Sequence, residues 1–121
     1  MPEKYQFHNP DGVYFVTPTV VHWIDVFTRK EYCYIITDAL NYCIDNKGLR
    51  VHGWCIMTSH LHFLISSENG TLLSDIIRDF KQFTSKKIVQ EVQTMIDESR
   101  REWLLKAFTR SGEKLRRVDT F

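Results

Sequence analysis

Two apolar runs separated by a three-residue polar turn constrain the fold more than any other part of the chain. Residues 51–57 and residues 61–65 flank the turn at residues 58–60. Because the spacer is so short, the two runs are expected to pair as a tight antiparallel hairpin. Side chains alternate between the faces of a strand, so His60 and His62 are expected on one face and the apolar residues on the other.

A first strand and a first helix are predicted upstream of this hairpin. Residues 13–21 are mainly β-branched or aromatic, which is typical of a strand. Pro18 lies inside this segment and lacks the N–H of a ladder hydrogen bond, which favours an edge position. Residues 29–47 carry apolar side chains at spacings of three and four and stop at Gly48. This pattern predicts an amphipathic helix that ends at a glycine.

Two more helices are predicted downstream of the hairpin. An apolar stripe begins at Leu73 and continues to Val92, and Phe83 follows it, so we expect Phe83 in the core. A third helix is predicted over residues 97–109. Residues 111–121 show little periodicity and are expected to form a frayed tail.

The element order predicts an α+β fold. Strand, helix, strand, strand, helix is most of a split βαβ unit, the ferredoxin-like arrangement, with an antiparallel sheet, helices on one face and the last strand missing. Without a fourth strand the first strand becomes an edge, where Pro18 is tolerated. A bare edge also offers a pairing surface to a second copy of the chain.

Composition limits the class of protein. A chain of 121 residues has room for one domain, over 1–121, and 43% hydrophobic with 26% charged residues excludes a disordered chain. No apolar run reaches the roughly 18 to 20 residues of a membrane span, so we expect a soluble, cytoplasmic protein without a membrane partner. Cys33, Cys43 and Cys55 fit neither a disulfide framework nor a zinc knuckle, and are expected to be buried free thiols.

Charge is unevenly distributed along the chain. The net charge is +1, with −2 over residues 1–70 and +3 over residues 71–121. A phosphate-binding surface is therefore expected in the second half of the chain.

The pair His60 and His62 is the sharpest chemical feature. Two imidazoles side by side on a strand can chelate one divalent ion, because each neutral ring supplies one nitrogen and the strand fixes their separation. Two ligands do not complete a site, so a further group or the substrate must contribute. Spacing alone equally supports two partly buried rings that are hydrogen-bonded to their neighbours.

Five segments together closely resemble the HUH-class tyrosine transposases of single-strand insertion sequences, particularly the REP-associated branch. They are VYFVT at 13–17, WIDVFTRKE at 23–31, WCIMTSHLH at 54–62, LSDIIRDFKQFTSKK at 73–87 and ESRREWLL at 98–105. The resemblance extends from about residue 13 to residue 110. Several ordered segments are more specific than the histidine pair alone, and they favour the metal interpretation.

The resemblance implies a bacterial protein of DNA transposition. In that family His60 and His62 would be catalytic metal ligands that hold Mg²⁺ or Mn²⁺ against a phosphate of single-stranded DNA, usually a hairpin. A tyrosine would then attack the phosphate and keep the strand in a covalent 5′-phosphotyrosine link during cleavage and rejoining. Relatives work as homodimers.

The chain departs from the family at the nucleophile. Family members carry the tyrosine on a helix well downstream of the histidine pair, whereas all five tyrosines here precede His60. We therefore nominate no nucleophile and expect the chain to be inactive alone. The alternative is a catalytically dead module that binds DNA hairpins and regulates full-length transposases. A third possibility, a hydrolase using activated water, would need Asp25 or Glu68 near the pair.

Candidate DNA contacts lie on the second and third predicted helices. Their basic side chains would neutralise phosphates without reading sequence. The candidates are Arg78, Lys81, Lys86, Lys87, Arg100 and Arg101.

Overall fold

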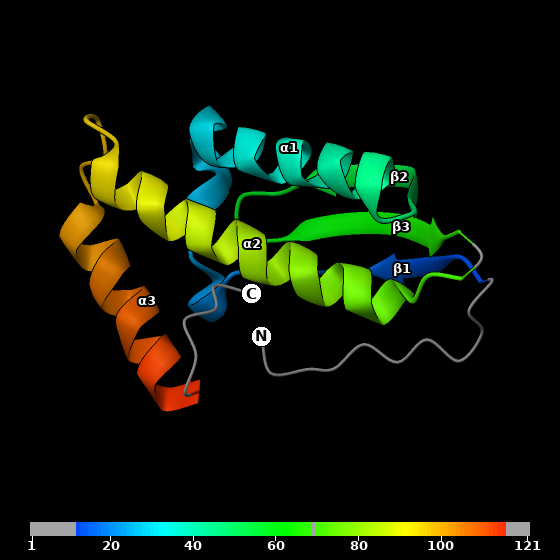
Figure 1. Ribbon diagram of the computed structural model, residues 1–121. Helices are drawn as coiled ribbons and strands as arrows, with labels where there is room; N and C mark the ends of the chain where they lie inside the picture. Colours follow the sequence, from blue (N-terminus) through cyan, green and yellow to red (C-terminus); the bar gives the residue numbers. More distant parts are fainter. Residues whose placement is uncertain (1–11, 69, 116–121) are drawn as a thin grey trace.

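The computed structural model of the chain describes residues 12–68 and 70–115. The elements, in chain order, are β1 (Tyr14–Val16), the 3₁₀ turns η1 (Val21–Trp23) and η2 (Val26–Thr28), α1 (Lys30–Asn46), β2 (Leu49–Ile56), β3 (Leu61–Ser67), α2 (Leu73–Thr94) and α3 (Arg101–Leu115) (Figure 1). The α+β prediction is confirmed.

The sheet has the order β1-β3-β2, and β3 pairs antiparallel with both neighbours. β1 and β2 therefore run in the same direction on either side of β3, as in a split βαβ unit. Residues 12–68 and 70–115 contain no fourth strand. The order agrees with the predicted arrangement, whose ferredoxin-like detail stays a prediction.

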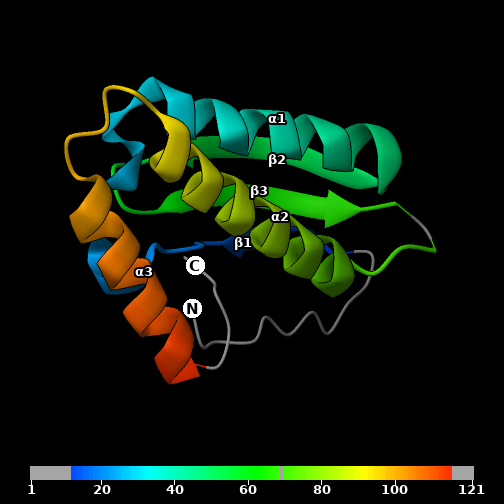
Figure 2. The same ribbon diagram turned by 60° about the vertical axis from the view of Figure 1, so that its left-hand side comes forward.

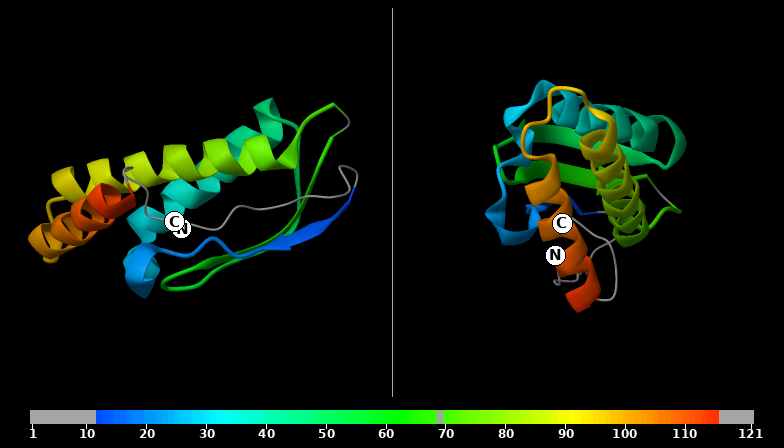
Figure 3. Two further views of the ribbon diagram at one scale, coloured as in Figure 1. Left: turned by 90° about the horizontal axis from the view of Figure 1, so that it is seen from below. Right: turned by 90° about the vertical axis from the view of Figure 1, so that its left-hand side faces the viewer.

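Both long helices cover one face of the sheet, as predicted. α1 and α2 lie side by side over the strands in Figure 2, and the view from below in Figure 3 shows both on the same side of the sheet. α3 packs against α2 near one end of the molecule. No described helix covers the other face, which we call the open face and which carries Phe15, His62 and Leu64.

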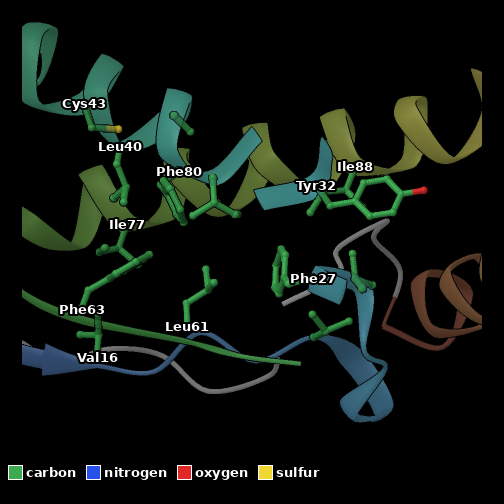
Figure 4. Close-up of a cluster of buried hydrophobic side chains, with 14 of the residues drawn as sticks. Val16, Phe27, Tyr32, Leu40, Cys43, Leu61, Phe63, Ile77, Phe80 and Ile88 are labelled. Atoms are coloured by element: carbon green, nitrogen blue, oxygen red, sulfur yellow. The ribbon is translucent and has the colours of Figure 1, made fainter. Parts of the chain in front are cut away.

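The core fills the space between the sheet and the helices. Leu61, Phe63 and Ile65 of β3 are fully buried, since alternate residues of this strand point toward α1 and α2. Phe63 and Phe80 of α2 meet edge to face, with ring centroids 5.6 Å apart (Figure 4). The hairpin predicted from the sequence thus provides the floor of the core.

β1 is shorter than the predicted strand of residues 13–21. Ladder pairing ends at Val16, two residues before Pro18, because proline cannot donate the next hydrogen bond. The chain still follows β3 beyond that point. The Pro18 carbonyl accepts a hydrogen bond from the Leu61 N–H at 2.9 Å, and Thr19 forms an isolated bridge with His60.

α1 ends close to its predicted stop signal, whereas the bounds of α3 differ from the predicted range. α1 ends at Asn46, and Gly48 has a φ of +78°, which a side chain rarely adopts. α3 begins later and ends later than the predicted range of residues 97–109, so residues 111–115 are helical and not a frayed tail. Residues 116–121 lie outside the described residues.

Two predictions of burial were wrong. Phe83 is 52% exposed, because the core face of α2 passes through Phe80, Thr84 and Ile88 and leaves position 83 outside it. The three cysteines are free, as predicted, but Cys33 is only half-buried and Cys55 is exposed. It pairs with His62 across the hairpin and so lies on the open face.

A buried carboxylate joins the α2–α3 connection to the start of α1. The Tyr32 hydroxyl donates to Oε2 of Glu98 at 2.6 Å, and the Arg100 backbone N–H donates to Oε1 at 2.9 Å. Arg29 Nε lies 3.1 Å from Oε2 as an ion pair without hydrogen-bond geometry. Burial by itself would raise the pKa of Glu98, but the hydrogen bonds from Tyr32 and Arg100 together lower it. The carboxylate is therefore ionised in the folded chain.

None of the helices within residues 12–68 and 70–115 combines the length and the apolar character that a membrane crossing requires.

We expect Glu98→Gln to lower the free energy of unfolding at neutral pH by about 2 kcal/mol, since it leaves two partly exposed arginines without their buried partner. The lowered pKa means that ionised Glu98 stabilises the fold above the ordinary glutamate pKa of about 4.3 and loses this effect as the pH falls through its own pKa. Urea unfolding at pH 7 and at pH 3 should therefore show the difference from wild type shrinking in acid. The matched control is Glu102→Gln, at an exposed position of α3. Equal stability of Glu98→Gln and wild type at pH 7 would contradict the prediction.

Candidate functional site

The hairpin places His60 and His62 next to each other. His62 lies on the open face because its neighbours Leu61 and Phe63 point into the core. The two imidazoles meet edge to face, with ring centroids 4.8 Å apart. Both residues are partly exposed, so the ring pair is accessible and is not sealed in the core.

Backbone hydrogen bonds fix the turn that precedes the pair. The Met57 N–H donates to the His60 carbonyl at 2.8 Å across the turn. The Val20 N–H donates to the carbonyl of Ser59, and the Phe27 N–H donates to that of Thr58, both at 2.9 Å. The segment between β1 and α1 thus holds the hairpin turn from outside, and His60 sits on a rigid support.

Each imidazole has one nitrogen beside a hydroxyl group. Nδ1 of His60 lies 3.2 Å from Oγ of Ser59, and Nδ1 of His62 lies 3.3 Å from Oγ1 of Thr17. When these hydroxyl oxygens accept a hydrogen bond from Nδ1–H, the Nε2 atoms carry the free lone pairs. Metal-binding histidines are commonly oriented in this way by a partner on the other ring nitrogen.

The two acidic residues considered as further ligands do not join the pair. The Asp25 carboxylate accepts a hydrogen bond from Nη1 of Arg100 at 2.9 Å. Glu68 follows the far end of β3, about 20 Å from His62 at the rise of a strand. Across the described ranges 12–68 and 70–115, no three His, Cys, Asp or Glu side chains form a cluster that could hold a metal. The pair can therefore supply two ligands, and the remaining ones must come from outside this set.

Two aromatic side chains that the sequence analysis did not select flank the histidines. Phe15 stacks on His62 with ring centroids 5.4 Å apart and planes 23° apart. Trp23 meets His60 edge-on, also at 5.4 Å. Strand alternation from Val16 could have placed Phe15 on the open face, but no sequence signal indicates Trp23.

The turn that carries Trp23 is strained. His22 and Trp23 have φ values of +57° and +56°, a region that costs non-glycine residues about 1–2 kcal/mol each. No periodic pattern predicts such a backbone, so the sequence does not indicate where the Trp23 side chain lies.

The predicted DNA-contact residues do not surround the histidine pair. Arg78, Lys86 and Lys87 are exposed on α2, and α2 covers the face of the sheet opposite His62. Arg78 also forms ion pairs with Asp75 and Asp79. If these side chains contact DNA, they do so on a second surface.

Three of the predicted DNA contacts are engaged or buried within the fold. Lys81 is 8% exposed. Arg100 pairs with Glu98 and Asp25. Arg101 donates to the backbone carbonyls of Val92 and Met95 at the end of α2. Sequence reasoning could not separate such internal bonds from a free basic surface.

The described tyrosines lie away from the histidine pair. Tyr32 is buried, and burial together with its hydrogen bond to Glu98 raises its pKa. Tyr34 and Tyr42 are exposed on α1 in the helix layer, and Tyr14 packs beside the core on the same side as Val16. Tyr5 lies outside the described residues.

Comparison with known families identifies the chain. The family model described as "Transposase IS200 like" matches residues 22–111. The match begins within η1, contains α1, the histidine hairpin and α2, and ends within α3. Comparisons with curated proteins and with solved structures found no match. Since the family model covers most of the chain, the protein belongs to the IS200-like transposase family.

Proposed function

We propose that this transposase-family chain binds single-stranded DNA hairpins and holds a divalent cation, Mg²⁺ or Mn²⁺, at His60 and His62. The observation that carries the proposal is the pair of adjacent, accessible imidazoles whose Nδ1 atoms both lie beside hydroxyl groups. The two imidazole nitrogens can occupy two coordination positions of such an ion. A bound ion would supply charge neutralisation at a phosphate during strand cleavage and rejoining.

The chain's own residues position that chemistry. His60 and His62 would bind through Nε2, while Ser59 and Thr17 would keep the rings in the binding tautomer and orientation. The hairpin turn adds rigidity, because two of its carbonyls accept hydrogen bonds from the backbone N–H groups of Val20 and Phe27. A rigid pair loses little entropy when an ion binds, which favours affinity.

A nucleophile for strand transfer has no candidate among the described tyrosines. Tyr14, Tyr32, Tyr34 and Tyr42 lie on the helix side of the sheet or in the core, whereas His62 lies on the open face. This placement supports the second candidate function, a module that binds hairpin DNA without joining to it and regulates full-length transposases. Both functions share the same DNA site and differ in the covalent step.

We expect calorimetry to detect Mn²⁺ binding to the wild-type chain and at least a tenfold loss of affinity in His60→Ala/His62→Ala, because both proposed protein ligands are removed. The control is His52→Ala, which removes an exposed imidazole of β2 that is hydrogen-bonded to Ser66 at 2.8 Å. Equal Mn²⁺ affinity of the double variant and the wild type would refute the metal site.

A labelled DNA hairpin with single-stranded flanks should bind this chain more tightly than a duplex of the same sequence in an electrophoretic shift. Mass spectrometry of the same mixture with Mn²⁺ should show no phosphotyrosine adduct, since no described tyrosine faces the histidine pair. A preference for duplex would contradict the proposed DNA class. An adduct would instead support strand transfer by the chain itself and would eliminate the regulatory module.

We also propose a homodimer, on the basis of the exposed side chains of the helix layer and of the outer edge of β1, which pairs with no strand among residues 12–68 and 70–115. Light scattering should give a mass approaching twice the 14.4 kDa of one chain. Dilution is the control, since it should return the mass toward that of one chain. A monomer mass at the highest soluble concentration would count against self-association.

A further inference from the structure

Four rings form a continuous row beside the sheet. Phe15 contacts His62, His62 contacts His60, and His60 contacts Trp23, with successive ring centroids 5.4, 4.8 and 5.4 Å apart. The two histidines occupy the middle of the row and the two aromatic side chains occupy its ends. Whatever binds at the histidine pair therefore has an aromatic ring on each flank.

Trp23 is held out of the core by its own turn. Its neighbours in the chain, Val20 and Ile24, are buried at 1% and 6% exposure, whereas Trp23 is 67% exposed. The left-handed backbone at His22 and Trp23 makes this possible. Strain that keeps a large aromatic side chain in water is not explained by stability and points to a role in binding.

Phe15 is exposed for a different reason. It lies between Tyr14 and Val16 on an edge strand, and Val16 takes the inward position. Phe15 pairs with Leu64 across β1 and β3, and it is 65% exposed on the open face. Its contact with His62 leaves most of the ring surface free.

The sheet offers little repulsion to a polyanion. Within residues 14–16, 49–56 and 61–67, the strands contain no aspartate or glutamate, and their charged residue is Arg50. The acidic residue nearest Trp23 in the chain is Asp25, whose carboxylate is paired with Arg100. A phosphate backbone can thus approach the open face without meeting an unpaired carboxylate of these strands.

We propose that Trp23 and Phe15 are base-stacking residues, which hold the unpaired bases on the two sides of the phosphate positioned at His60 and His62. The inference rests on the proposed function and adds the means of holding the strand. Every base has a π-face, so such platforms bind single strands with little sequence preference. Stacking would also keep the flanking bases unpaired, which favours single-stranded over duplex DNA at this site.

The test measures the affinity of a fluorescein-labelled thymidine oligonucleotide of about 16 nucleotides, a length within the usual site size of single-strand binding folds. Fluorescence anisotropy with the full chain should show about a tenfold loss for Trp23→Ala and for Phe15→Ala, the loss expected when one stacked base is released. Trp23→Phe should restore most of the affinity, because it keeps a ring. The matched controls Trp103→Ala and Phe83→Ala remove rings that are 56% and 52% exposed on α3 and α2, and should leave the affinity unchanged.

Two further measurements separate stacking from charge and from misfolding. The dependence of affinity on salt should be the same for Trp23→Ala and wild type, since stacking releases no counterions. The wild-type chain should bind an abasic oligonucleotide of the same length at least tenfold more weakly, a result that needs no variant to fold.

Four outcomes would overturn the inference. If the wild-type chain binds the thymidine and abasic strands equally, or if Trp23→Ala and Phe15→Ala bind like the controls, DNA binding stands but base stacking at these rings is wrong. If Trp23→Ala changes the mass seen by light scattering and not the affinity, the ring contacts a second copy of the chain. If the wild-type chain binds no oligonucleotide, the proposed function itself fails.

Discussion

The alternation of side chains along β3 is the constraint on which the rest of the structure depends. Leu61, Phe63 and Ile65 close the core against α1 and α2, while His62 and Leu64 lie on the opposite face of the strand. One strand therefore carries three fully buried apolar residues and one of the two histidines of the candidate metal site. A shift of its register by one residue would bury the imidazole and expose the core, so packing fixes the position of the site.

The segment between β1 and α1 connects the site to the α2–α3 connection. It bonds to the hairpin turn through Val20 and Phe27, carries Trp23 to His60, and meets the start of α3 through Asp25 and Arg100. The segments resembling the transposase family at residues 23–31 and residues 98–105 thus converge in space. Their convergence around Glu98 gives a structural reason for two similarities that lie far apart in the sequence.

Sequence patterns predicted the parts of the fold that depend on local periodicity. The hairpin, the helix ending before Gly48 and the apolar stripe of α2 all follow from short-range spacing. The prediction that Phe83 is buried was wrong, because widely spaced apolar residues do not define where the buried face of a helix ends. The length of β1 could not be predicted in this way, because it depends on the contact of the Pro18 region with β3, which is distant in the sequence.

The histidine pair of the candidate site could be predicted from the sequence, but its surroundings could not. Strand alternation placed His60 and His62 together, as the ring contact shows. Their partners Thr17, Phe15 and Trp23 come from another part of the chain. Strand alternation indicates the face on which Phe15 lies, but no local pattern indicates its contact with His62 or the position of Trp23. The internal bonds of Arg100 and Arg101 could not be predicted from the sequence either. A basic residue that caps a helix or pairs with a buried acid has the same sequence pattern as one that binds a phosphate.

The β1 edge of the sheet is short, which limits backbone pairing with another chain on that side. β1 offers a ladder of three residues, and Pro18 prevents its extension toward the C-terminus. A strand from another molecule therefore has few backbone groups to pair with at the β1 edge, whereas the opposite edge is formed by β2 with eight residues. Pro18 thus restricts backbone pairing at the β1 edge to a short ladder, so that a contact between two copies there would depend mainly on side chains.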